Sequence, residues 1–186
     1  MSAAKGPSSL RVTPELDALV KLFHPGLQAL GTFREATEAE LPAIPRKLLW
    51  HDHHMTVALE EHHGCELDVQ VLKSLVTETH YSRHVLLRCR CSDRVEQYGI
   101  GRLNLTFLDE TVRNELLSER IPLGRVLINN AVLRQVRLLS LWRIEPSAQL
   151  REFLQLNASD VCYGRTALIY CNAVPAVELL EIVSAL

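Results

Sequence analysis

An arginine occupies a position where the surrounding pattern predicts an apolar side chain. Residues 81–91 alternate as a β-strand does, and one face of that strand carries Arg83, Val85, Leu87, Cys89 and Cys91. Because the other members of this face are apolar or thiol-bearing, we expect it to point into the core. A buried guanidinium keeps its charge and is costly to leave unpaired, so Arg83 needs an anion, either a protein carboxylate or a ligand.

The last two predicted strands, 163–171 and 176–184, also carry charges on apolar faces. Glu181 shares its face with Val177, Leu179 and Val183, and Arg165 shares its face with Tyr163, Ala167 and Ile169. A carboxyl group in such a place is either paired or holds its proton. Two interpretations remain open. One is a buried arginine–glutamate ion pair without a ligand, and the other is a pocket whose charges hold two ends of a small polar molecule.

The elements that would position these side chains follow from the hydrophobic periods. A period of two predicts strands near 67–75, 81–91, 97–107, 133–144, 163–171 and 176–184, and helices are expected at 13–24, 45–64, 109–119 and 147–156. Residues 27–43 show no clear period and are expected to form a loop or short helix. Since the strands follow one another through short connections, we predict an α+β fold, an antiparallel sheet of about six strands with helices packed on one side. A flexible leader, 1–12, is expected to precede one domain, 13–186.

Composition narrows the class of protein. The 20 basic and 22 acidic residues give a formal net charge of -2, so nothing favours a nucleic acid or an anionic membrane as a partner. No apolar run is long enough to span a bilayer, and the first ten residues lack the apolar core of a signal peptide. Five cysteines, an odd number, then indicate free thiols in a cytoplasmic protein, expected to be a monomer or a homodimer.

Other motifs carry weaker signals. His51, His53 and His54 surround Asp52, but their spacing does not favour one metal site, and exposed helix ends explain them equally well. The pair Cys89 and Cys91 lacks a second cysteine pair, so two core thiols are the better interpretation. We therefore expect no metal. Glycines at 99 and 101 indicate a strand that a backbone or a ligand approaches closely.

An ordered set of short motifs resembles the chorismate lyase family, bacterial enzymes that split chorismate into 4-hydroxybenzoate and pyruvate. It covers roughly residues 45–186 and consists of Met55-Thr56, Tyr81-Ser82-Arg83 followed by Val85-Leu86-Leu87, Gly101-Arg102, Pro122-Leu123-Gly124-Arg125, Tyr163-Gly164-Arg165 and Glu178-Leu179-Leu180-Glu181. The resemblance implies an antiparallel sheet with a buried ligand site under flaps, and no metal or organic cofactor.

The resemblance also implies roles for individual residues. Arg83 matches the arginine that holds the substrate carboxylate, and Glu181 matches the glutamate near the ring hydroxyl, with Glu178 as the alternative match. Met55 and Leu123 lie in pieces whose backbone touches the ligand. The remaining motif arginines, which are expected to have supporting roles, are Arg102 and Arg165.

Two classes of function follow. The first is catalysis, a chorismate pyruvate-lyase with Arg83 and Glu181 as catalytic residues. The second is a non-catalytic, effector-type domain of the same fold that binds a small aromatic acid. A related fold serves as the effector domain of some transcription regulators. The residues ahead of position 45 show no basic winged-helix pattern, which favours the enzyme. A third alternative is a lyase-like protein that acts on a changed substrate.

Overall fold

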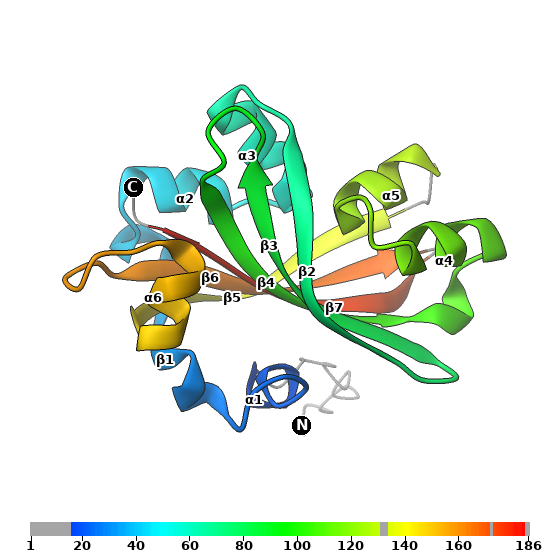
Figure 1. Cartoon of the computed structure of the whole chain (residues 1–186), viewed down its shortest axis with the longest axis horizontal. Coiled ribbons are helices and arrows are strands. Elements are labelled where there is room, and N and C mark those ends of the chain that lie inside the picture. The colour runs from blue at the N-terminus through cyan, green and yellow to red at the C-terminus, as the bar shows by residue number, and fades with distance from the viewer. Residues whose placement is uncertain (1–15, 131–133, 172, 185–186) are drawn as a thin grey trace, which may run out of the picture.

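The computed structural model describes residues 16–130, 134–171 and 173–184, and this part of the chain forms one antiparallel sheet. Its seven strands lie in the order β1-β5-β6-β7-β4-β3-β2, and the sheet is strongly twisted (Figure 1). The strands are β1 (Gly31–Ala36), β2 (Leu67–Val76), β3 (His80–Cys89), β4 (Val95–Asn104), β5 (Arg134–Pro146), β6 (Cys162–Cys171) and β7 (Val174–Ser184).

Six α-helices in the described ranges complete an α+β fold, which confirms the predicted fold class. They are α1 (Leu16–Val20), α2 (Ala43–Leu49), α3 (Met55–His63), α4 (Glu110–Leu117), α5 (Leu123–Asn129) and α6 (Ala148–Leu154). Three short 3-10 helices join them: η1 (Leu27–Ala29), η2 (Glu38–Glu40) and η3 (Leu105–Phe107). Within these ranges, none of the helices combines the length and the apolar character needed to cross a bilayer.

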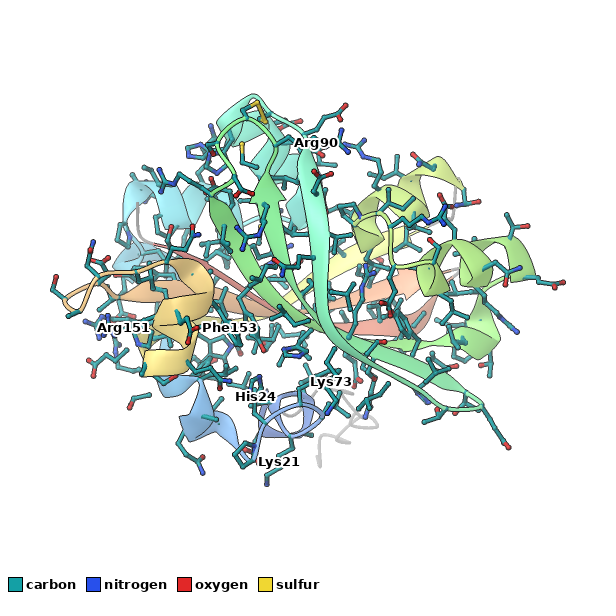
Figure 2. The ribbon with its side chains drawn as sticks, in the orientation of Figure 1. Lys21, His24, Lys73, Arg90, Arg151 and Phe153 are labelled. Carbon is teal, nitrogen blue, oxygen red and sulfur yellow. A yellow bond between two sulfur atoms is a disulfide. The ribbon has the colours of Figure 1, made fainter. Side chains whose placement is uncertain are left out.

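Helices α1 and α6 cover one face of the sheet. This face carries the even-numbered side chains of β4 and β7, such as Tyr98 and Leu180, packed with Leu19, Leu150 and Leu154 from the two helices. Figure 2 labels His24 and Phe153, which lie on this side of the molecule. The Tyr98 hydroxyl lies 2.8 Å from His24 Nε2 and 3.3 Å from His84 Nδ1, so a buried polar network sits inside an apolar cluster.

His84 in this network makes stability depend on pH. It is 8% exposed and its ring stacks on Phe23 with centroids 4.6 Å apart. Burial, aided by the nearby charges of His24 and Lys73, lowers the pKa of His84 from 6.5 to about 4. Since the unfolded chain binds this proton more readily, the free energy of unfolding falls as pH drops from 6.5 toward 4, by up to about 3 kcal/mol.

Urea unfolding of the wild type and of His84→Gln at several pH values tests this dependence. We expect the wild type to lose more stability than the variant between pH 6.5 and pH 4, because carboxylates titrate equally in both proteins. Parallel stability curves for the two proteins would contradict the assignment to His84.

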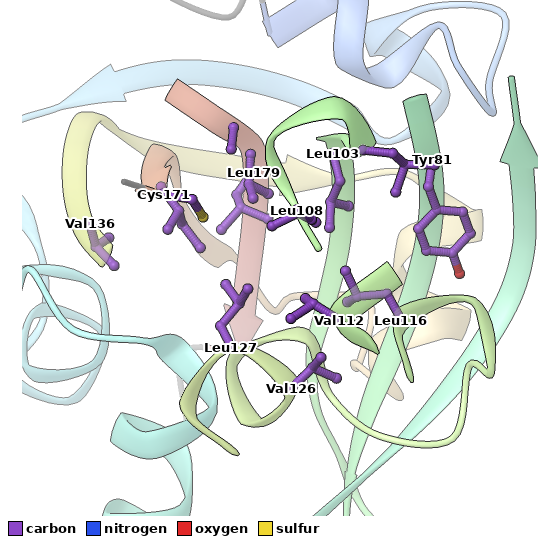
Figure 3. Close-up of a cluster of buried hydrophobic side chains, with 14 of the residues drawn as sticks. Tyr81, Leu103, Leu108, Val112, Leu116, Val126, Leu127, Val136, Cys171 and Leu179 are labelled. Atoms are coloured by element: carbon purple, nitrogen blue, oxygen red, sulfur yellow. The ribbon is translucent and has the colours of Figure 1, made fainter. Parts of the chain in front are cut away.

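Helices α2 to α5 cover the opposite face, which carries the odd-numbered side chains of β4 and β7. Here α4 and α5 press Val112, Leu116, Val126 and Leu127 onto Leu103 and Leu179 (Figure 3). Further along the same face, α2 and α3 pack Leu49, Met55 and Leu59 against Leu87 and Val183. The candidate site lies between these two groups of helices.

The strand register brings Arg83, Arg165 and Glu181 onto this second face. Arg83 on β3 pairs with Gly101 on β4, while Glu181 on β7 pairs with Gly99 on β4 and with Arg165 on β6. Two glycines on the central strand therefore leave open the space between the arginine and the glutamate, as expected for close approach of another group.

Three elements differ from the sequence-based predictions. Residues 31–36, expected as loop or short helix, form the edge strand β1 along β5, where only Ala36 is buried, so the strand has no apolar alternation to reveal it. The expected helix 45–64 is broken at residues 50–54 into α2 and α3. The segment 121–124, for which no helix or strand was expected, opens helix α5 with Pro122 as its N-cap.

The sequence predicted about six strands with helices on one side. The structure has a seventh strand, β1, and helices on both faces of the sheet. The leader 1–12 and the expected start of the first helix at residues 13–15 lie outside the described residues.

Candidate functional site

A cavity opens on the α2–α5 face between β3, β4, β7 and the first turns of α3 and α5. Its empty volume is about 440 Å³, including its mouth to solvent. The lining is mostly apolar, and its residues are Thr56, Val69, Arg83, Val85, Leu87, Gly99, Ile100, Gly101, Leu103, Pro122, Leu123, Gly124, Leu179, Leu180 and Glu181.

Arg83 lines this cavity as a buried cation. It is 4% exposed, and its Nη1 atom has no hydrogen-bond partner among the described residues. The guanidinium carbon lies 5.9 Å from the centroid of the Tyr81 ring, whose hydroxyl donates to Glu119 over 2.9 Å. Burial lowers the pKa of Arg83 from its usual value, but a guanidinium is not deprotonated in proteins, so the arginine is charged. Burial raises the pKa of Tyr81 to about 12, so the phenol is neutral.

Glu181 lines the same cavity but is bound by Arg165 rather than by Arg83. The Arg165 Nε atom donates to Glu181 Oε2 over 2.6 Å, and the two side chains are 1% and 8% exposed. The buried ion pair left open by the sequence therefore exists, but it uses Arg165, the third inward charge. Arg83, which was expected opposite the glutamate, is left with its Nη1 atom unpaired.

Arg165 also fixes the segment that separates α2 from α3. Its Nη1 atom donates to the carbonyl oxygens of Leu49 and His51 over 3.3 and 3.0 Å, and its Nη2 atom donates to that of His53 over 3.2 Å. These contacts brace the break between the end of α2 at Leu49 and the start of α3 at Met55. Arg165 is thus a structural tie beneath the cavity.

The histidine cluster belongs to this tie. The His51 ring lies 2.6 Å from the Leu48 carbonyl oxygen through Nε2 and 3.3 Å from Arg165 Nη1 through Nδ1. Burial and the charge of Arg165 lower the pKa of His51 to about 4, so its ring is neutral near pH 7. His51, which the sequence offered as a possible metal ligand, therefore contacts Arg165 and the end of α2.

The first turns of α3 and α5 meet at the cavity. A Cβ atom on Gly124 would lie 3.1 Å from Thr56 Oγ1 and 3.2 Å from His54 Cβ, so a glycine is needed for this approach. An ion pair between Arg125 and Glu60 joins the same two helices. Leu123 is among the residues that line the cavity.

Three other expected site residues lie elsewhere. Met55 is buried in the core between α2, α3 and the sheet and is not among the lining residues. Arg102 and Glu178 pair with each other over 2.5 Å on the α1–α6 side of β4 and β7. Glu178 therefore points away from Arg83, and of the two alternative glutamates Glu181 is the one at the cavity.

Sequence reasoning missed Gln97. It is 4% exposed, and its Oε1 atom has no hydrogen-bond partner among the described residues. Its Nε2 atom lies 3.0 Å from where a Cβ atom on Gly99 would stand, which places the amide at the edge of the cavity. The signal was available, because Gln97 alternates with Gly99 and Gly101 on the face of the sheet that also carries Arg83.

The thiols also differ from expectation. Cys65 and Cys91 form a disulfide with Cα atoms 6.2 Å apart, whereas Cys89 and Cys162 are free and buried. The pairing joins residues 26 positions apart, which the β2–β3 hairpin brings together. Free thiols were expected because the cysteine count is odd and the first ten residues lack the apolar core of a signal peptide.

Comparison with known proteins supports the fold and corrects the predicted activity. No protein-family model and no curated protein matches the sequence. PhnF from Mycobacterium smegmatis is similar in structure with a TM-score of 0.54 and 10% identity, over 69% of this chain and 62% of that chain. The effector domain of the same protein has a TM-score of 0.50 and 9% identity, over 71% of this chain and 88% of that chain. A GntR-family transcriptional regulator from Bacillus cereus has a TM-score of 0.43 and 11% identity, over 63% of this chain and 90% of that chain.

The likeness to PhnF and to its effector domain shows the fold, which is chorismate lyase-like. The chain spans 62% of the length of the PhnF structure. The expectation of a chorismate pyruvate-lyase was wrong, because the similar structure is described as an effector domain and not as an enzyme. The geometry gives a physical reason, since the carboxylate once assigned a catalytic role is held by Arg165.

Proposed function

We propose that this chain is a non-catalytic binding domain for a small aromatic carboxylic acid. One observation carries the proposal: a buried guanidinium, that of Arg83, lines an apolar cavity with Nη1 unpaired. Leaving such a donor without an acceptor costs about 1–3 kcal/mol or more. A ligand carboxylate would satisfy it through charge-assisted hydrogen bonds, which guanidinium groups form in pairs.

A second feature favours an anion near Arg83. Helix α3 begins at the cavity, and Thr56 in its first turn lines the cavity. The backbone N–H groups of a first helical turn have no partner within the helix and carry a partial positive charge. Arg83 and the α3 N-terminus thus favour the same sign of ligand charge.

The walls between the polar groups favour a flat apolar body. Side chains of valine, leucine and isoleucine form most of the lining, and the two strand glycines leave room beside them. Burial of apolar ligand surface stabilises a complex by roughly 25 cal/mol per Å². An aromatic ring fits this surface better than a sugar or a phosphate ester.

Gln97 defines the far end of the ligand. Its unpartnered Oε1 atom accepts a hydrogen bond, so a hydroxyl or amino group is expected there. Gln97 lies four residues along β4 from Gly101, the partner of Arg83, a span of about 13 Å. The side chains reach inward from both ends, which shortens this span to the scale of one substituted ring.

The absence of a free acid or base in the described lining supports binding without catalysis. Arg83 and Glu181 are the charged residues among the described lining, and Glu181 is already committed to Arg165. General acid–base chemistry needs a group that can exchange a proton near neutral pH.

Calorimetric titration with 4-hydroxybenzoate, benzoate and phenol tests the proposal. We expect 4-hydroxybenzoate to bind more tightly than benzoate, because it also donates to Gln97, and phenol to bind least because it lacks the carboxylate. Incubation with chorismate should release no pyruvate. Equal binding of phenol and 4-hydroxybenzoate, or no binding of any acid, would refute the proposal.

A substitution that fills the cavity is expected to block binding. Gly101 faces Arg83, and a Cβ atom there would lie 3.3 Å from Leu179 Cδ2. Gly101→Val adds a branched side chain inside the cavity on a strand that favours one. We expect binding of 4-hydroxybenzoate to weaken more than tenfold, measured by calorimetry, while circular dichroism shows an unchanged fold. Unchanged affinity would place the ligand elsewhere.

A further inference from the structure

Three cysteine sulfurs converge at the end of the β2–β3–β4 hairpins, away from the ligand cavity. The Sγ atoms of Cys65, Cys89 and Cys91 all lie within 4.8 Å of one another. Figure 2 shows the disulfide at this end of the sheet, near Arg90. Cys65 and Cys89 are buried and Cys91 is exposed, so solvent reaches the group from one side.

The fold holds these three residues in place independently of the disulfide. Cys89 is the last residue of β3, and Cys91 lies in the turn after it. The Cys91 N–H donates to Cys65 Sγ over 3.0 Å, a contact that would also stabilise a thiolate. Beside them, the Arg90 N–H donates to the Glu66 carbonyl oxygen over 3.1 Å, and its side chain pairs with Asp68 over 2.7 Å.

We propose that Cys65, Cys89 and Cys91, once reduced, bind one thiophilic metal ion of the zinc and copper(I) class. The group consists of sulfur ligands, and thiolates select such soft ions over magnesium or calcium. Zinc–sulfur bonds of about 2.3 Å require sulfurs roughly 3.8–4.0 Å apart. Three atoms already within 4.8 Å reach that spacing by small side-chain movements.

The disulfide and the metal exclude each other. Reduction by a thiol or phosphine adds two electrons and two protons to the Cys65–Cys91 bond, giving two thiols. Binding of the ion then releases the protons of all three thiols to solvent. Either state joins the end of α3 to the hairpin, so the metal replaces the cross-link that reduction removes.

Cadmium titration of the full chain, reduced with a phosphine and freed of metal, tests the site. Cadmium is spectroscopically visible through sulfur-to-metal charge transfer in the ultraviolet. We expect saturation at one ion per chain, an absorption intensity matching three thiolates, and displacement by zinc. Cys162→Ala is the matched control and should bind as the wild type does, because Cys162 is fully buried and burial raises the pKa of its thiol to about 12.

Cys89→Ala is the decisive variant, because it keeps the Cys65–Cys91 pair and removes the third sulfur. We expect cadmium affinity to fall more than ~100-fold, beyond the loss seen when only a supporting partner is removed. If Cys89→Ala folds poorly, Cys91→Ser replaces it as the test, because Cys91 is exposed. We expect Cys91→Ser to lose cadmium affinity to a similar extent. Wild-type affinity in either folded variant, or no uptake by the fully reduced wild type, would overturn the proposal.

Discussion

Arg83→Met is expected to abolish binding of 4-hydroxybenzoate and to make the unliganded protein more stable. Truncating one partner of a buried, hydrogen-bonded charge pair costs about 2 kcal/mol or more, which is at least ~30-fold in affinity. Without a ligand, however, Arg83 is buried with Nη1 unpaired. Methionine has an unbranched apolar chain and removes this penalty, so the free energy of unfolding should rise by about 1 kcal/mol or more.

These opposite effects separate a binding residue from a structural one. Calorimetry measures the loss of affinity, and urea unfolding of the ligand-free protein measures the gain in stability. Arg102→Met is the matched control, because Arg102 is paired with Glu178 on the other side of the sheet. It should leave affinity unchanged and should not stabilise the protein. Destabilisation of Arg83→Met together with normal affinity would remove Arg83 from the ligand site.

Arg165→Met is expected to be the most destabilising single substitution near the cavity. It leaves Glu181 buried without its partner and releases the carbonyl oxygens of Leu49, His51 and His53. Breaking a buried ion pair from one side costs about 3–5 kcal/mol. We expect a loss of this size in the free energy of unfolding, measured by urea denaturation.

A double variant separates the two parts of this loss. Arg165→Met combined with Glu181→Leu removes the unpaired carboxylate and should recover part of the stability, whereas the loss of the carbonyl contacts remains. Arg102→Met breaks a partly exposed pair and should cost no more than about 1 kcal/mol. Equal losses for Arg165→Met and Arg102→Met would contradict the role of Arg165 as the tie beneath the cavity.

The sequence by itself determined the sheet and the inward charges. Six strands could be predicted because each alternates apolar and polar residues along a half-buried or buried surface. The same alternation identified Arg83, Arg165 and Glu181, all buried on one face of the sheet. It could not identify β1, which lies at the edge with little burial.

Only the tertiary structure decided how these charges are paired. Alternation gives the face of a side chain but not its partner, and Glu181 could have met either arginine. The register of β6 against β7 places Arg165 directly beside Glu181, whereas Gly99 and Gly101 hold Arg83 one strand further away across an open space. That register leaves Arg83 Nη1 unpaired in a cavity, and this is the observation on which the proposed binding function rests.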